Sequence, residues 1–88
     1  MNKQDFFEAA CNASDLTVTF YNGNEIPYRF KMYKIFAEQY DDEITIRGAY
    51  NDFIIVNIND CVVETDEYDE IEFLFSTDSD HKIGIVFK

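Results

Sequence analysis

The chain has 88 residues, of which 47% are hydrophobic and 17% aromatic, and its net charge is −11. This length predicts one domain over residues 1–88, and the aromatic content excludes the composition of a disordered chain. The strongly negative charge argues against nucleic acid or an anionic membrane as a direct ligand. Because the N-terminal sequence lacks an apolar export signal and no segment has the apolar length of a membrane span, we expect a cytoplasmic protein.

The first predicted elements are a short helix and a strand. Asn2 followed by Asp5 is typical of a helix N-terminus, and the apolar residues of the segment 6–12 share one helical side, so the helix is expected to end near Asn12. Residues 16–21 then alternate apolar and polar side chains as a strand does. Asn22-Gly23 is a strong hairpin signal, so the chain should turn back there.

Residues 28–40 fit two interpretations. Tyr28, Phe30 and Met32 alternate with basic residues as in a strand, whereas apolar residues also recur from Ile26 to Tyr40 at the spacing of a helix. We favour a strand as far as Lys34, because the hairpin signal requires a returning strand. A helical turn through Gln39 is then expected.

The remaining elements are predicted to be strands. Residues 44–47 and 54–58 flank a turn at residues 48–52, and a bulge at Asp60 would point Cys61 or Val63 inward. A final hairpin is expected between residues 71–76 and 82–88, around a turn at residues 77–81. The predicted fold class is therefore α+β, with a short N-terminal helix packed on a largely antiparallel sheet of about five or six strands.

Few residues indicate catalysis or metal binding. His81 is the only histidine, and no nucleophile, zinc or phosphate-binding motif accompanies it. The acids around Asp78 and Asp80 could hold calcium, but the segment lacks the central glycine and closing glutamate of a calcium loop. We predict no enzyme activity, no cofactor and no metal site, and leave open whether Cys11 and Cys61 pair.

Charge is distributed unevenly along the chain. Residues 1–34 carry four acids and four bases, whereas residues 35–88 carry fourteen acids and three bases, so the second part holds the whole net charge. The segment ETDEYDEIE, residues 64–72, contains six carboxylates and no base. Acids of this kind either keep a surface soluble or match a basic partner. The long stretch almost without bases favours a basic partner.

This profile, small, very acidic, rich in Tyr and Phe and without enzyme motifs, resembles that of phage-encoded inhibitors of the anti-CRISPR and anti-restriction type, which mimic nucleic acid. The resemblance implies an inhibitor in the cytoplasm of a host bacterium that blocks the basic nucleic-acid groove of a defence nuclease, most simply a CRISPR effector. Carboxylates would occupy the places of phosphates, with tyrosines as anchors. The predicted partner-binding residues are Glu64, Asp66, Glu67, Tyr68, Asp69, Glu70 and Glu72, supported by Tyr40, Asp41, Asp42, Glu43 and Tyr50.

Other functions fit the same sequence. An immunity protein or antitoxin for a basic nuclease toxin would use acids and tyrosines in the same way. A calcium-binding domain or an accessory phage structural protein with a solvated acidic face are further alternatives. The sequence leaves open the target, the oligomeric state, and whether the acids mimic DNA or only contact a basic protein patch.

Overall fold

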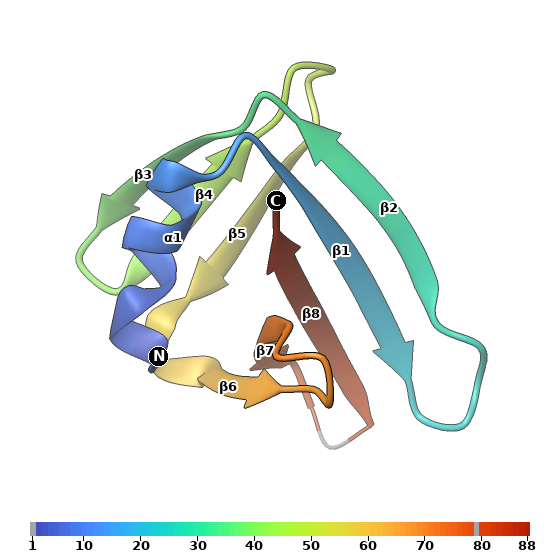
Figure 1. Ribbon diagram of the computed structural model, residues 1–88. Helices are drawn as coiled ribbons and strands as arrows, with labels where there is room; N and C mark the ends of the chain where they lie inside the picture. Colours follow the sequence, from blue (N-terminus) through green and yellow to red (C-terminus); the bar gives the residue numbers. More distant parts are fainter. Residues whose placement is uncertain (1, 79) are drawn as a thin grey trace.

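The computed structural model describes residues 2–78 and 80–88 and shows two antiparallel sheets with a short helix beside them (Figure 1). The chain begins with a 3-10 turn, Lys3–Asp5, that continues into helix α1, Phe6–Asn12. Asn2 caps the turn, since its side chain accepts the Gln4 N–H while the Asp5 carboxylate accepts the Asn2 N–H. The predicted helix N-terminus and its end at Asn12 are confirmed.

The larger sheet has five strands in the order β2-β1-β8-β7-β6. These strands are β1 (Asp15–Asn22), β2 (Tyr28–Tyr33), β6 (Cys61–Thr65), β7 (Ile71–Ser76) and β8 (His81–Phe87). The last strand of the chain, β8, therefore lies at the centre of the sheet, paired with β1 on one side and β7 on the other. Strand β8 thus joins β1, from the start of the chain, to β7 by hydrogen bonds on both of its edges.

The smaller sheet is the meander β3-β4-β5, made of β3 (Phe36–Tyr40), β4 (Glu43–Arg47) and β5 (Phe53–Asn57). After β5, a 3-10 turn at Ile58–Asp60 returns the chain to the larger sheet as β6. Helix α1 lies beside β3 in Figure 1. The chain thus leaves the larger sheet after β2 and re-enters it at β6.

The core lies where the inner faces of both sheets meet the helix. Phe6 of α1 is fully buried, and its ring lies 5.1 Å from Phe73, 4.9 Å from Phe75 and 5.3 Å from Phe87, measured between centroids. Aromatic pairs of this geometry each contribute about 0.5–1.5 kcal/mol beyond area burial. The other buried core residues are Ala10, Leu16, Val18, Met32, Ile44, Ile46, Val56, Ile58, Cys61 and Ile85.

The α+β class, the N-terminal helix and the largely antiparallel five-stranded sheet are confirmed, and three further strands form the second sheet. The last hairpin has the expected facing residues, with Phe73 opposite Ile85 and Phe75 opposite Ile83. Ser79, in the predicted turn at residues 77–81, lies outside the described residues. The chain also turns back after Asn22 as predicted, through residues 23–27.

Two local predictions are wrong. The helical turn expected through Gln39 is strand β3, because residues 36–40 pair with β4 and this pairing overrides the helical spacing. Lys34, at a φ of +51°, makes the sharp break between β2 and β3. The bulge expected at Asp60 is instead the 3-10 turn that carries the chain between sheets, although Cys61 does point inward and is buried.

Within residues 2–78 and 80–88, no helix combines the length and the apolar character needed to cross a bilayer. Helix α1 has seven residues.

Candidate functional site

The acidic run of the sequence folds into a β-hairpin, residues 61–76, which we call the acidic hairpin. It consists of β6, β7 and the loop 66–70 between them. Glu64 pairs directly opposite Glu72, so both side chains leave the same face with Cβ atoms about 4.5–5.5 Å apart. Like charges directly opposite each other on paired strands repel. A cation or hydrogen-bond donor placed between them would remove that repulsion.

One carboxylate of the hairpin holds its loop together. Asp66 Oδ1 accepts hydrogen bonds from the N–H groups of Tyr68 (2.8 Å) and Glu70 (2.9 Å), and the Asp66 carbonyl accepts the N–H of Asp69 (3.1 Å). Asp69 has a φ of +61°, a conformation that aspartate tolerates better than most residues. Glu67, Tyr68 and Asp69 therefore project from an ordered tip, and Tyr68 is 81% exposed.

A hollow of about 400 Å³ lies beside the hairpin, on the face of the five-stranded sheet that is turned away from the core. We call it the central hollow. Thr19 and Leu74 lie on this outer face, yet they are only 4% and 7% exposed, so the face is partly covered. The lining residues come from all five strands and the hairpin loop: Thr17, Thr19, Tyr21, Arg29, Glu64, Thr65, Asp66, Glu70, Glu72, Val86 and Lys88.

A hydrogen bond crosses the sheet in this hollow. The Tyr21 hydroxyl donates to Glu72 Oε2 at 2.7 Å, which joins β1 to β7 over the intervening strand β8. Burial, together with the adjacent Glu72 carboxylate, raises the pKa of Tyr21 to about 12. The two side chains meet above Gly84, where a Cβ atom would lie 2.8 Å from Glu72 Cδ and 2.9 Å from Tyr21 Cε2. A side chain at position 84 would therefore force Glu72 or Tyr21 to shift.

Basic residues also reach the central hollow, which the sequence order concealed. Arg29 comes from β2 and Lys88 follows β8, and Lys88 Nζ lies 3.4 Å from Glu70 Oε2. Both members of that pair are about half exposed, so it contributes little to stability. Four carboxylates against two cations still leave the hollow negative. The expectation that the acidic segment stands without neighbouring bases is thus wrong for Glu70.

A second hollow of about 380 Å³ adjoins the first across the Tyr21–Glu72 hydrogen bond. It shares Tyr21, Glu64 and Glu72 with the central hollow, and its other lining residues are Gly23, Leu74, Asp80 and Lys82. Glu64 and Glu72 therefore stand between two open spaces. A partner side chain could approach this facing pair from either hollow.

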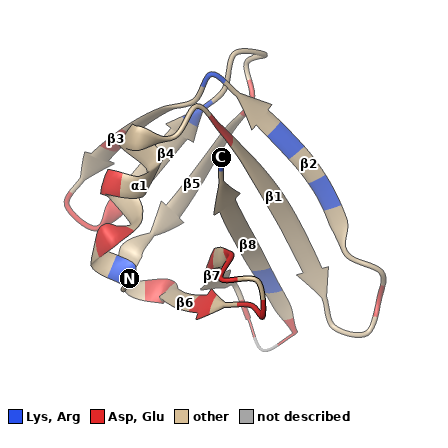
Figure 2. Cartoon of the chain, viewed as in Figure 1, with Lys and Arg blue, Asp and Glu red and all other residues tan. Residues whose placement is uncertain are grey.

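The supporting acids predicted at residues 41–43 lie elsewhere. Asp41 and Asp42 form the turn between β3 and β4, with Asp41 at a φ of +54°. Asp42 has a structural role, because its carboxylate accepts from Asn59 Nδ2 (3.0 Å) and its carbonyl from the Ile58 N–H (2.8 Å). These residues and Glu43 belong to the smaller sheet and line neither hollow. Figure 2 shows the acidic residues of this turn and those of the acidic hairpin in separate parts of the fold, while β2 carries basic residues.

The supporting tyrosines also lie outside the hollows. Tyr40 is 69% exposed on β3, and its hydroxyl donates to Glu38 Oε2 at 3.0 Å, which raises the pKa of Tyr40. Tyr50 is 77% exposed in the loop between β4 and β5, where its ring meets Tyr33 edge to face at 6.3 Å. Of the predicted residues, the structure brings together those of the acidic hairpin and leaves residues 40–43 and Tyr50 apart.

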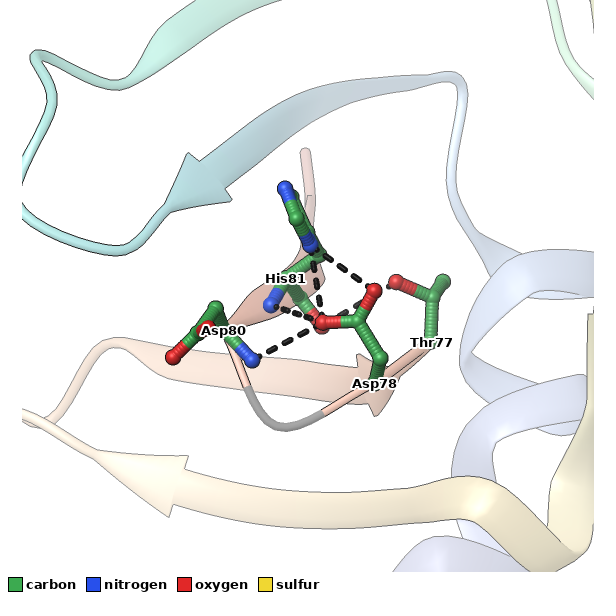
Figure 3. A network of polar contacts seen from close by, with 4 residues as sticks. All are labelled: Thr77, Asp78, Asp80 and His81. Carbon is green, nitrogen blue, oxygen red and sulfur yellow. Dashed lines mark hydrogen bonds and ion pairs between the residues drawn. The ribbon is translucent and has the colours of Figure 1, made fainter.

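The lone histidine takes part in a local turn network (Figure 3). Asp78 accepts hydrogen bonds from the N–H groups of Asp80 (2.8 Å) and His81 (2.9 Å), and its carboxylate lies 2.7 Å from His81 Nδ1. The Asp80 N–H, followed by the His81 side chain, lowers the pKa of Asp78. Both side chains are more than half exposed, so these contacts form a surface turn.

The other groups considered in the sequence are metal-ligating side chains and the two cysteines. Across the described parts of the chain, no group of three or more His, Cys, Asp or Glu side chains is placed to hold a metal ion. Cys11 and Cys61 are both free, the first exposed and the second buried. Burial raises the pKa of the Cys61 thiol to about 11, which keeps it protonated and unreactive at neutral pH.

Sequence reasoning missed the residues that complete the central hollow. Thr17, Thr19 and Tyr21 form the outward side of β1, and their alternation with apolar residues was visible, but nothing in the sequence paired this side with the acidic hairpin. Arg29 and Lys88 were missed because their proximity to the acids depends on the strand order. The signal available was the polar outer face of β1.

Comparisons of the chain with protein-family models, with curated proteins and with solved structures found no match.

Proposed function

We propose that the protein is a stoichiometric inhibitor that uses the acidic hairpin to block the basic nucleic-acid-binding groove of a bacterial defence nuclease, most simply a CRISPR effector. The observation that supports this proposal is the gathering of Glu64, Asp66, Glu70 and Glu72 around one open hollow, next to an ordered tip. Lys and Arg side chains of such a groove normally bind phosphates. Here they would meet carboxylates instead.

The facing glutamates give a physical reason for binding a cation. Glu64 and Glu72 repel each other in the free protein, and a guanidinium or ammonium group between them replaces repulsion with two charge-assisted hydrogen bonds. Glu72 is already oriented by the Tyr21 hydroxyl, so little side-chain entropy is lost on binding. The negative hollow provides orientation and fast association, and binding should weaken as salt increases.

The hairpin tip provides the anchor. Tyr68 is 81% exposed, and the Asp66 hydrogen bonds hold the backbone of its loop, so it presents a large ring with a small loop-ordering penalty. Tyrosines held in this way are typical centres of protein interfaces. Glu67 and Asp69 flank Tyr68 and would pair with bases at the rim of the groove.

The test compares two variants that remove the same charge. Glu64→Gln/Glu67→Gln/Glu70→Gln removes three of the six carboxylates of residues 64–72 and retains Asp69, together with Asp66 and Glu72, which make structural hydrogen bonds. The matched control, Glu8→Gln/Glu25→Gln/Asp60→Asn, removes three charges from exposed positions elsewhere.

DNA cleavage by a panel of purified RNA-guided nucleases is measured with increasing protein over a series of salt concentrations. We expect the wild type to inhibit at about one equivalent, the hairpin variant to be at least tenfold weaker, and the control to stay close to the wild type. Equal loss in both variants, or no inhibition of any nuclease in the panel, would refute the proposal. Inhibition of a basic nuclease toxin alone would assign the immunity function instead.

A further inference from the structure

The outer face of the smaller sheet exposes large apolar side chains. Phe36 and Tyr40 on β3, and Phe53 and Ile55 on β5, are 62%, 69%, 57% and 53% exposed. The register places Phe36, Arg47 and Phe53 in one row across the three strands. The Arg47 guanidinium lies 5.9 Å from the centroid of the Phe53 ring. We call this surface the β3–β5 face.

The apolar area of this face is large for a protein of this size. Three aromatic side chains and one isoleucine, each more than half exposed, present roughly 450 Å² of apolar surface. That area is comparable with the largest patch of a typical monomer, and such patches often mark interaction sites. With the polar residues between them, the β3–β5 face approaches the ~800 Å² that each partner buries in a standard interface.

The charge pattern of the face fits a second copy of the same chain. Its central strand, β4, displays Glu43, Thr45 and Arg47 outward, so the side chains along the strand are negative, neutral and positive in that order. A two-fold axis through Thr45 and across the strands would place Arg47 of each copy against Glu43 of the other. Within one chain, Arg47 lies four positions after Glu43 on an extended strand, or about 13 Å away, which is too far for an ion pair.

The local charge also favours a second copy over a strongly basic partner. The outward residues of the three strands include the acids Glu38 and Glu43 and the base Arg47, so this face is close to neutral in a chain of net charge −11. Two copies can meet here while their acidic hairpins, which belong to the other sheet, stay apart. Repulsion between the copies is therefore smallest in this arrangement.

We propose that the protein forms a symmetric dimer through the β3–β5 face, with the two smaller sheets packed against each other and reciprocal Arg47–Glu43 ion pairs on either side of the two-fold axis. This inference is independent of the proposed function, because it uses residues that line neither hollow. Each dimer would present two acidic hairpins.

The first test uses a matched pair of glutamate substitutions. Ile55→Glu places a charge inside the face, whereas Ile26→Glu makes the same change in the β1–β2 loop, where Ile26 is 91% exposed. Sedimentation equilibrium over a hundredfold concentration range is expected to show a dimer for the wild type and for Ile26→Glu, and a monomer for Ile55→Glu. Circular dichroism is used to check that each variant is folded. A wild type that stays monomeric throughout, or a dimeric Ile55→Glu, overturns the proposal.

The second test addresses the symmetry by charge exchange. Arg47→Glu or Glu43→Arg alone would place like charges together and should raise the dimer Kd at least tenfold. The double variant Glu43→Arg/Arg47→Glu restores opposite charges across the axis and should return the Kd to within about threefold of the wild type. A double variant as weak as the sum of the single variants would refute the two-fold arrangement.

Discussion

Replacing Gly84 with alanine tests the close approach on which the central hollow depends. The added methyl group would lie 2.8 Å from Glu72 Cδ and 2.9 Å from Tyr21 Cε2, so the Tyr21–Glu72 hydrogen bond must break. A hydrogen bond to a charged group is worth about 1.5–3 kcal/mol, and alanine recovers about 0.4–1 kcal/mol by restricting the unfolded chain. The net loss is then about 0.5–2.6 kcal/mol, or a fall in Tm of roughly 2–21 °C for a domain of this size.

A second variant separates this mechanism from a general intolerance of alanine in β8. In a Glu72→Ala background the methyl group meets only the Tyr21 ring, so Gly84→Ala should leave stability unchanged or raise it by up to about 1 kcal/mol through the restricted unfolded chain. Urea denaturation of the wild type, both single variants and the double variant measures the coupling. A Gly84→Ala protein as stable as the wild type, or an equal loss in both backgrounds, would contradict this account.

Three further predictions concern titration and reactivity. Because the folded state keeps Tyr21 neutral, with a pKa of about 12, its contribution to stability is present below its ordinary pKa of 10.0 and is lost as the pH rises toward 12. An ultraviolet titration should therefore lose its last phenolate step in Tyr21→Phe. Cys11 should react at once with a thiol reagent at neutral pH, whereas Cys61, with its pKa raised to about 11, should react only on unfolding. Because the pKa of Asp78 is lowered, its ionised carboxylate stabilises the turn at pH values above the ordinary pKa of 3.8. This stabilisation is lost as the pH falls below that value. In an NMR titration, His81→Ala should raise the Asp78 pKa, and an unchanged value would remove the histidine from this network.

The sequence was most informative where a pattern is local. The capping residues, the short helix, the strand ending near Lys34 and the register of the last hairpin all depend on neighbouring residues, and each was predicted. The prediction for residues 36–40 was wrong because their apolar spacing suits a helix, while their conformation is decided by pairing with β4. A single sequence contains no direct sign of that pairing.

The candidate site shows the same division. The acids of residues 64–72 could be identified as a group, since they are adjacent in the chain and lie in one hairpin. The hollow beside them could not be predicted, because Tyr21, Arg29 and Lys88 reach it only through the order β2-β1-β8-β7-β6. The acids at residues 41–43 looked equivalent in sequence, but they belong to the other sheet.

The central position of β8 has a consequence for how the protein is made. Three parts of the fold can form while the chain is still being synthesised: the pair β1-β2, the meander β3-β4-β5 and the hairpin β6-β7. The larger sheet becomes continuous only when β8 inserts between β1 and β7 and pairs with both. Until then β1 and β7 each keep an unpaired edge, which is a risk for aggregation. The final step of folding must bring together segments some sixty or more residues apart, so folding should be slow and should not complete until β8 has been synthesised.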